Sequence, residues 1–158
     1  MNKEEILSIL SRVMDPEIPV LSIADLGILR SVDITDGKIY IQITPTYSGC
    51  PALETIREDI RLLLLQNGFD QVEIQQVLSP AWTTDWMTES GKQKLENYGI
   101  AAPAGSHHCF PSGEDEPRSC PHCHSTNLTL ISRFGSTACK ALYRCTDCLE
   151  PFDYFKCH

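Results

Sequence analysis

The chain has 158 residues, enough for one ordinary domain or for a small domain with a module too short to build its own core. Its formal net charge of −8 is uneven: residues 1–119 carry 9 Lys and Arg against 18 Asp and Glu, whereas residues 120–158 carry 4 against 3. A phosphate backbone repels such an acidic body, which argues against nucleic acid as a partner.

No apolar run approaches the roughly 18 residues that cross a bilayer, and the acidic start MNKEEILSIL lacks the pattern of a signal peptide. We therefore expect a cytoplasmic protein with no membrane partner, in a compartment where close cysteine pairs hold metal more often than they form disulfides. Seven of the eight cysteines lie in the last fifty residues. This shift predicts a hydrophobic-core domain followed by a small module that metal ions or disulfides hold together.

Helical spacing of apolar residues between positions 2 and 14 predicts an amphipathic helix that Asn2 caps and Asp15-Pro16 ends. Residues 28–44 alternate between apolar and polar on both sides of Asp36-Gly37. Because Asp-Gly is a strong signal for a two-residue turn, this pattern predicts a β-hairpin.

Helical periodicity returns over residues 51–66, with proline in front and Asn-Gly behind. A third strand is predicted over 71–79, and a short helix that ends near Gly99 follows it. This order of elements predicts a small α+β domain over residues 1–98. Residues 99–119 are rich in Gly, Pro, Ala and Ser and are interpreted as a linker.

Two CxxC pairs, CPHC at 120–123 and CTDC at 145–148, lie on either side of a segment that can form a β-hairpin. Two such turns supply the four corners of a tetrahedral zinc site, which predicts a zinc-ribbon module over residues 120–158. The predicted ligands are Cys120, Cys123, Cys145 and Cys148. A disulfide-linked tail and an iron or iron–sulfur version of the same four cysteines are the alternatives.

The other C-terminal cysteines lie outside the two CxxC pairs. Cys139 is interpreted as a packed core residue, whereas the terminal Cys157 and His158 are possible additional metal ligands. The linker residues His107, His108 and Cys109 are interpreted as adventitious metal binders.

Cys50 is the only cysteine of the first hundred residues, and it directly precedes the helix over 51–66. Unpaired N–H groups and the helix dipole at a helix start stabilise an anion. We therefore expect this thiol to ionise more readily than a free cysteine and to act as a nucleophile or a metal ligand. The alternative is a small residue that simply fits the turn.

The stretches DPEIPVLSIADLGIL and TPTYSGCPALETI resemble the SufT-like family of iron–sulfur assembly domains, with its DPE loop, DLG turn and CP cysteine. The resemblance implies that Cys50 handles a metal or cluster and that Asp15, Glu17 and Asp25 form an acidic rim around it. Each carboxylate also has a structural alternative: Asp15 caps its loop, Glu17 is solvated, and Asp25 caps the turn before the strand at Ile28.

The C-terminal FGSTACKALYRCTDCLEPFDYFKCH, together with CPHC, resembles a family of accessory proteins encoded with the bacterial phenylacetyl-CoA 1,2-epoxidase of phenylacetate catabolism. This resemblance implies a non-enzymatic role in assembling iron or an iron–sulfur cluster in the oxygenase or its reductase component, which are the expected partners. It also implies structural zinc and a transient iron or cluster. Because a lone thiolate cannot hold a cluster, a homodimer that shares one is possible.

Two other functions are weighed against this one. A thiol-chemistry enzyme would need a base near Cys50, but all five histidines lie in the linker or the ribbon. A zinc-ribbon adaptor subunit of the epoxidase, with no metal transfer, is the main alternative.

Overall fold

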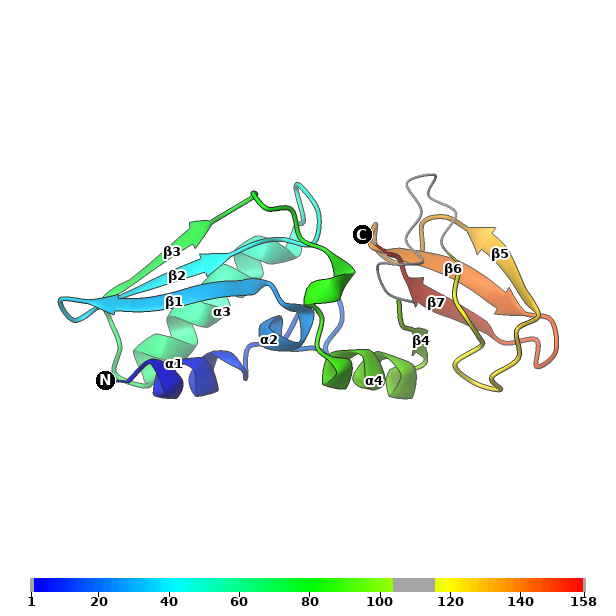
Figure 1. Cartoon of the computed structure of the whole chain (residues 1–158), viewed down its shortest axis with the longest axis horizontal. Coiled ribbons are helices and arrows are strands. Elements are labelled where there is room, and N and C mark those ends of the chain that lie inside the picture. The colour runs from blue at the N-terminus through cyan, green and yellow to red at the C-terminus, as the bar shows by residue number, and fades with distance from the viewer. Residues whose placement is uncertain (1, 104–115, 158) are drawn as a thin grey trace. The chain divides into compact units, whose positions relative to one another are not determined.

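The computed structural model describes residues 2–103 and 116–157 (Figure 1). The chain divides into two compact units, one of Met1–Trp82 with Trp86–Thr88 and the other of Thr83–Asp85 with Glu89–His158. Both units contain helix and sheet, and the four predicted zinc ligands gather in the second. The predicted fold class, a small α+β domain followed by a C-terminal zinc ribbon, is confirmed.

The first unit packs two helices against a three-stranded sheet of order β1-β2-β3 (Figure 1). Strands β1 and β2 are antiparallel, whereas β2 and β3 are parallel because α3 crosses over between them. The elements are α1 (Lys3–Leu10), α2 (Ile23–Leu26), β1 (Leu29–Thr35), β2 (Lys38–Ile43), α3 (Ala52–Gln66) and β3 (Val72–Gln76).

The β1–β2 hairpin follows directly from its sequence. Thr35 pairs with Lys38, so only Asp36 and Gly37 form the turn, and both have the positive φ that a two-residue turn of this kind requires. Alternate residues of β2, Ile39 and Ile41 among them, are buried beneath the helices. The predicted hairpin is confirmed.

The first helix is shorter than predicted. It ends at Leu10 instead of continuing to residue 14, and the N–H groups of Arg12 and Val13 reach carbonyls three residues back. Val13 is still buried, which explains why its position fits the helical pattern. The chain must leave the helix here because Met14 pairs with Ser22 in an isolated bridge.

A four-residue helix that sequence periodicity did not reveal, α2, lies directly before β1. It ends at Gly27, which has a φ of +72°, and a Cβ there would overlap the backbone carbonyl of Trp86. Trp82 Nε1 also donates to the Leu26 carbonyl at 2.8 Å, and the Arg30 guanidinium lies 3.5 Å from the centre of the Trp86 ring. Both tryptophans therefore hold the end of the first unit against α2.

Within its described residues, the second unit has a four-stranded sheet of order β4-β7-β6-β5 and one α-helix. Its core is an aromatic cluster. The Tyr143 ring stacks on Phe152, with 6.1 Å between ring centres, and packs edge-on against Tyr154, with 5.8 Å between ring centres. A short 3-10 helix, η1 (Thr84–Trp86), precedes its elements, which are α4 (Glu89–Tyr98), β4 (Ile100–Ala101), β5 (Leu128–Ser132), β6 (Lys140–Cys145) and β7 (Pro151–Phe155).

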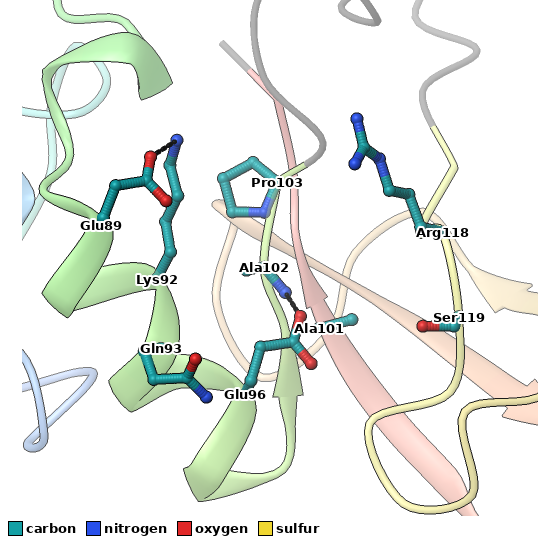
Figure 2. A pocket seen from close by; sticks show the side chains of 9 residues that line it. All are labelled: Glu89, Lys92, Gln93, Glu96, Ala101, Ala102, Pro103, Arg118 and Ser119. Atoms are coloured by element: carbon teal, nitrogen blue, oxygen red, sulfur yellow. Dashed lines mark hydrogen bonds and ion pairs between the residues drawn. The ribbon is translucent and has the colours of Figure 1, made fainter.

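The boundary between the units lies near residue 88, not at residue 98 as predicted, because α4 belongs to the second unit. The start of the predicted linker over 99–119 is a strand, since β4 pairs with β7. The Ala102 N–H donates to Glu96 Oε1 at 2.9 Å, which connects the segment after β4 to α4 (Figure 2). Residues 104–115 of this linker lie outside the described residues.

Among the helices of residues 2–103 and 116–157, none combines the length and the apolar character needed to cross a membrane.

Gly27→Ala should destabilise the first unit by roughly 2–4 kcal/mol, because it combines backbone strain with overlap against Trp86. The matched control is Gly37→Ala, which has a similar φ of +79° but nothing within 4 Å of a Cβ and should cost only about 1 kcal/mol. Urea unfolding followed by tryptophan fluorescence measures both, since Trp82 and Trp86 belong to this unit. Equal costs for the two variants would contradict the close-approach explanation.

Candidate metal centre and Cys50 site

The four cysteines of the two CxxC pairs form one group, with their sulfur atoms all within 4.8 Å of one another. The sulfurs of Cys120 and Cys148 lie 3.7 Å apart, and those of Cys123 and Cys145 lie 3.5 Å apart. A tetrahedron with zinc–sulfur bonds of about 2.3 Å has edges of about 3.8 Å. The donor set and its spacing therefore fit a structural zinc ion held by these four residues.

Backbone N–H groups already favour negative charge at part of this group. The backbone N–H groups of Cys148 and Asp147 lower the pKa of Cys145 to about 7, and the Cys148 N–H has the larger effect. Although the Glu150 N–H favours the Cys148 thiolate, desolvation and the neighbouring thiols raise the pKa of Cys148 to about 12. Four thiolates this close repel one another, so all four ionise together only when a cation lies among them.

Asp147 ties the two CxxC turns together, and sequence reasoning missed it. Its carboxylate accepts hydrogen bonds from Ser125 Oγ and, at 3.0 Å, from Asn127 Nδ2, both of which follow the first CxxC pair. These bonds hold the pKa of Asp147 below its usual value. The sequence did carry a signal for this contact. One CxxC turn contains an acidic residue, and hydroxyl and amide residues follow the other CxxC turn.

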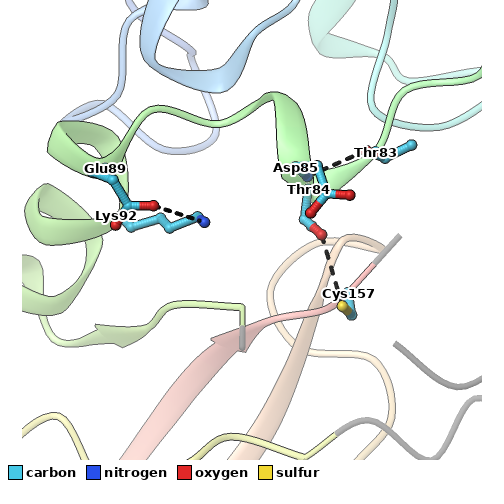
Figure 3. Close-up of polar contacts among 6 residues, drawn as sticks. All are labelled: Thr83, Thr84, Asp85, Glu89, Lys92 and Cys157. Atoms are coloured by element: carbon cyan, nitrogen blue, oxygen red, sulfur yellow. Dashed lines mark hydrogen bonds and ion pairs between the residues drawn. The ribbon is translucent and has the colours of Figure 1, made fainter. Parts of the chain in front are cut away.

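The remaining cysteines of the second unit lie outside the group of four. Cys139 is buried, as expected for a packed residue, and its sulfur lies 3.0 Å from Thr137 Oγ1. The prediction that Cys157 is a possible metal ligand is contradicted, because this cysteine is disulfide-bonded. Its sulfur lies 3.7 Å from Thr84 Oγ1 (Figure 3). His158, His107, His108 and Cys109 lie outside the described residues, so a part for His158 in metal binding stays a prediction.

Cys50 lies in the turn between β2 and α3, where the positive φ of Gly49 reverses the chain. The cap residue of α3 is Pro51, which places Cys50 one position before the cap. The Cys50 thiol is half-buried and is hydrogen-bonded by the Ala52 backbone N–H and by the Tyr47 side chain. The predicted position at a helix start is therefore observed, and Tyr47 is an additional contact that sequence reasoning did not identify.

The expectation that Cys50 ionises readily is wrong. Burial is the largest effect on this thiol and raises its pKa, and the negative charges of Glu17 and Asp15 raise it further. The hydrogen bonds from Ala52 and Tyr47 act in the opposite direction without reversing the result. Without a nearby cation, the Cys50 thiol is protonated at neutral pH.

Asp15 shapes the loop that brings Glu17 to this site. The Asp15 side chain is buried, and its Oδ1 atom accepts hydrogen bonds from the N–H groups of Glu17 and Ile18, both at 2.8 Å. The DPE sequence therefore folds as an Asx-type turn, in which the first carboxylate fixes the backbone of the second. Two of the three predicted rim carboxylates thus act on the Cys50 thiol.

Asp25 forms a capping box at the start of α2. Its Oδ2 atom accepts from the Ser22 N–H at 3.1 Å and from Ser22 Oγ at 3.0 Å, while Ser22 Oγ accepts from the Asp25 N–H. Thr88 Oγ1 donates to the other carboxylate oxygen at 3.3 Å. Asp25 therefore has the capping role that the sequence left open as an alternative.

Family models match both halves of the chain. An iron–sulfur cluster assembly protein model matches residues 3–75, and a PaaD zinc beta ribbon domain model matches residues 104–156. The fold and its two sites thus define a two-module protein, an iron–sulfur assembly domain joined to a zinc ribbon. An Escherichia coli (strain K12) protein, named as one of the subunits of 1,2-phenylacetyl-CoA epoxidase, is 55% identical over 97% of this chain and 92% of its own length. The chain belongs to the PaaD family.

Other relatives match the first module. An Fe-S protein maturation auxiliary factor of Porphyromonas gingivalis is 37% identical over 59% of this chain and 90% of its own length. The crystal structure of a domain of unknown function from Bacillus anthracis has a TM-score of 0.55 and 27% identity, and covers 59% of this chain and 90% of that chain. A conserved hypothetical protein from Thermotoga maritima has a TM-score of 0.52 and 27% identity over 60% of this chain and 94% of that chain.

Cys120→Ser should abolish stoichiometric zinc binding and unfold the ribbon strands, because structural zinc sites supply folding free energy directly. Cys139→Ser is the matched control: it changes a buried cysteine outside the group of four and should retain about one zinc per chain. Elemental analysis and far-UV circular dichroism, with and without a chelator, measure both effects. Full zinc content in Cys120→Ser would refute this ligand set.

Glu17→Gln should increase the alkylation rate of Cys50 at neutral pH, since removing a neighbouring negative charge lowers the thiol pKa and raises the thiolate fraction. Asp70→Asn, just beyond the far end of the 15-residue α3 and about 20 Å away, should leave the rate unchanged. Iodoacetamide labelling across a pH series, read by peptide mass spectrometry at Cys50, measures the rates. A slower reaction in Glu17→Gln would reverse the electrostatic interpretation.

Proposed function

We propose that this protein is an accessory factor of a phenylacetyl-CoA epoxidase that assists the assembly of iron or an iron–sulfur cluster in the oxygenase or its reductase component. The relative named for the epoxidase supports the epoxidase system, and the relatives named as Fe-S maturation auxiliary factors support the activity. The observation that carries the proposal is the Cys50 thiol beside the Glu17 and Asp15 carboxylates in the matching domain.

This combination of groups is suited to a cationic cargo. Partial burial and, to a smaller extent, two carboxylates raise the pKa of the Cys50 thiol and keep it protonated when no cation is present. An iron cation brought to the sulfur reverses the sign of the local field and displaces the thiol proton, as thiol ligands do on binding metal. Thiolate sulfur is also the ligand that iron–sulfur clusters require. Loading is therefore coupled to proton release, and unloading to proton uptake.

One thiolate cannot hold such a cargo by itself. The other ligands must come from a second copy of the chain or from the client, and incomplete ligation makes the cargo easy to transfer. Asp25 has a positioning role in this proposal, because its capping box shapes the loop that follows Asp15 and Glu17. The ribbon keeps its own zinc as a structural ion and takes no part in transfer.

The proposed role is non-catalytic. Residues 1–106 contain no histidine, so the first unit supplies no imidazole base for a Cys50 nucleophile. The raised pKa of Cys50 also disfavours a nucleophile that must be a thiolate at rest.

Anaerobic analysis of zinc, iron and sulfide in the wild type, Cys50→Ser and Cys139→Ser tests the proposal, with each variant also expressed in cells whose epoxidase activity depends on this protein. In Cys50→Ser, zinc should stay near one per chain, whereas iron or sulfide and the epoxidase activity should be lost. Cys139→Ser should match the wild type. If Cys50→Ser keeps its metals and supports full activity, the protein is instead an adaptor held together by zinc.

A further inference from the structure

The second unit exposes three large apolar side chains at the end of β5 and in the loop after it. Phe134 is 68% exposed, Ile131 is 53% exposed and Leu130 is 43% exposed. We call these three residues the Phe134 patch. Single exposed apolar residues are common, but three large ones at the end of one strand and in the loop after it make this region a candidate interaction site.

The loop that carries Phe134 is held in place by several contacts. Ser132 Oγ donates to the Phe134 carbonyl at 2.8 Å and accepts from the Phe134 N–H at 3.2 Å. The next residue, Gly135, donates to the Lys140 carbonyl at 2.7 Å, and a Cβ on Gly135 would lie only 2.6 Å from Asp153 Oδ1. An aromatic side chain presented by a constrained loop loses little conformational entropy when a partner binds it.

Two basic residues, Lys156 and Arg133, accompany the patch, together with one carboxylate, Asp153. Lys156 Nζ lies 4.4 Å from the centre of the Phe134 ring and donates to the Arg133 carbonyl at 3.0 Å. Arg133 is exposed and directly precedes Phe134. Asp153, the carboxylate that contacts this loop, accepts a hydrogen bond from Ser136 Oγ at 3.4 Å. The basic character is notable because the chain as a whole carries a net charge of −8.

We infer that the Phe134 patch, with Arg133 and Lys156, is a docking surface for an acidic segment of the epoxidase component that this protein serves. This inference rests on the proposed function and adds the chemistry of the partner. An apolar side chain of that segment packs on Phe134, and its carboxylates pair with the two basic side chains.

Side chains, rather than addition of a strand, make this contact. Within the described residues β5 is the outer strand of its sheet, which alone would favour pairing with a partner strand. However, its register with β6 shifts between Leu130 and Ser132, so Ile131 sits at a bulge. A bulge interrupts the straight edge that a partner strand needs, and here it lies beside Phe134.

The test measures binding of the full-length zinc-loaded protein to the purified oxygenase and reductase components separately, by biolayer interferometry. Phe134→Ser and Arg133→Glu should each weaken binding to one component by about tenfold or more, and added salt should weaken wild-type binding. The matched controls are Leu65→Ser and Arg61→Glu, because both residues are exposed on α3 of the first unit. They should bind as the wild type does. Zinc content confirms that each variant is folded.

Equal binding by Phe134→Ser and the wild type would overturn the docking surface, as would failure of wild type to bind either component. Self-association of the wild type that Phe134→Ser abolishes, without component binding, would identify a second copy as the occupant and also overturn the inference. Cys50→Ser separates the two proposals. If Cys50→Ser binds normally but fails to restore epoxidase activity, the proposed function stands, whatever the result for Phe134→Ser. If Cys50→Ser restores activity fully, the proposed metal handling is wrong, and the docking surface is judged on Phe134→Ser alone.

Discussion

A cysteine sulfur binds metal only as a thiolate, and both cysteine sites of this protein depend on how that negative charge is stabilised. In the ribbon, backbone N–H groups of the CxxC turns begin the stabilisation, and the spacing of four sulfurs matches a tetrahedral ion that completes it. Around Cys50, burial and two carboxylates act against the thiolate. In the proposed function, the same chemical group therefore serves permanent metal binding in one unit and conditional binding in the other.

This difference agrees with the parts that the two units have in the proposed function. The aromatic core of the ribbon includes two of the predicted zinc ligands, Cys120 and Cys145, which predicts that its folding depends on metal binding. The first unit has a conventional apolar core of helices on a sheet, so we expect it to fold without metal. The DPE loop beside Cys50 is fixed by Asx and capping hydrogen bonds, and the Cys50 thiol itself is half-buried and hydrogen-bonded by Ala52 and Tyr47.

Local sequence patterns predicted much of this architecture correctly. The β1–β2 hairpin, α3 and β3 follow from periodicity and turn residues that act over a few positions, and the paired CxxC spacing is sufficient to predict the four-thiol group. The patterns failed where distant residues decide the outcome. Helix α2 is only four residues long and depends on a capping box and on Trp86, and β4 is a two-residue strand that exists because β7 lies beside it.

The sequence by itself determined the candidate residues for metal chemistry: four ribbon cysteines, a cysteine at a helix start and a DPE loop. Tertiary structure alone decided the electrostatic state of Cys50, because Glu17 and Asp15 are more than thirty residues away in the chain and act on the thiol through space. It also decided that Asp25 contacts Thr88, which is far away in the chain, whereas the capping box of Asp25 with Ser22 is local. Residue type and spacing specify a possible ligand, whereas burial and through-space charge specify whether that ligand is ionised.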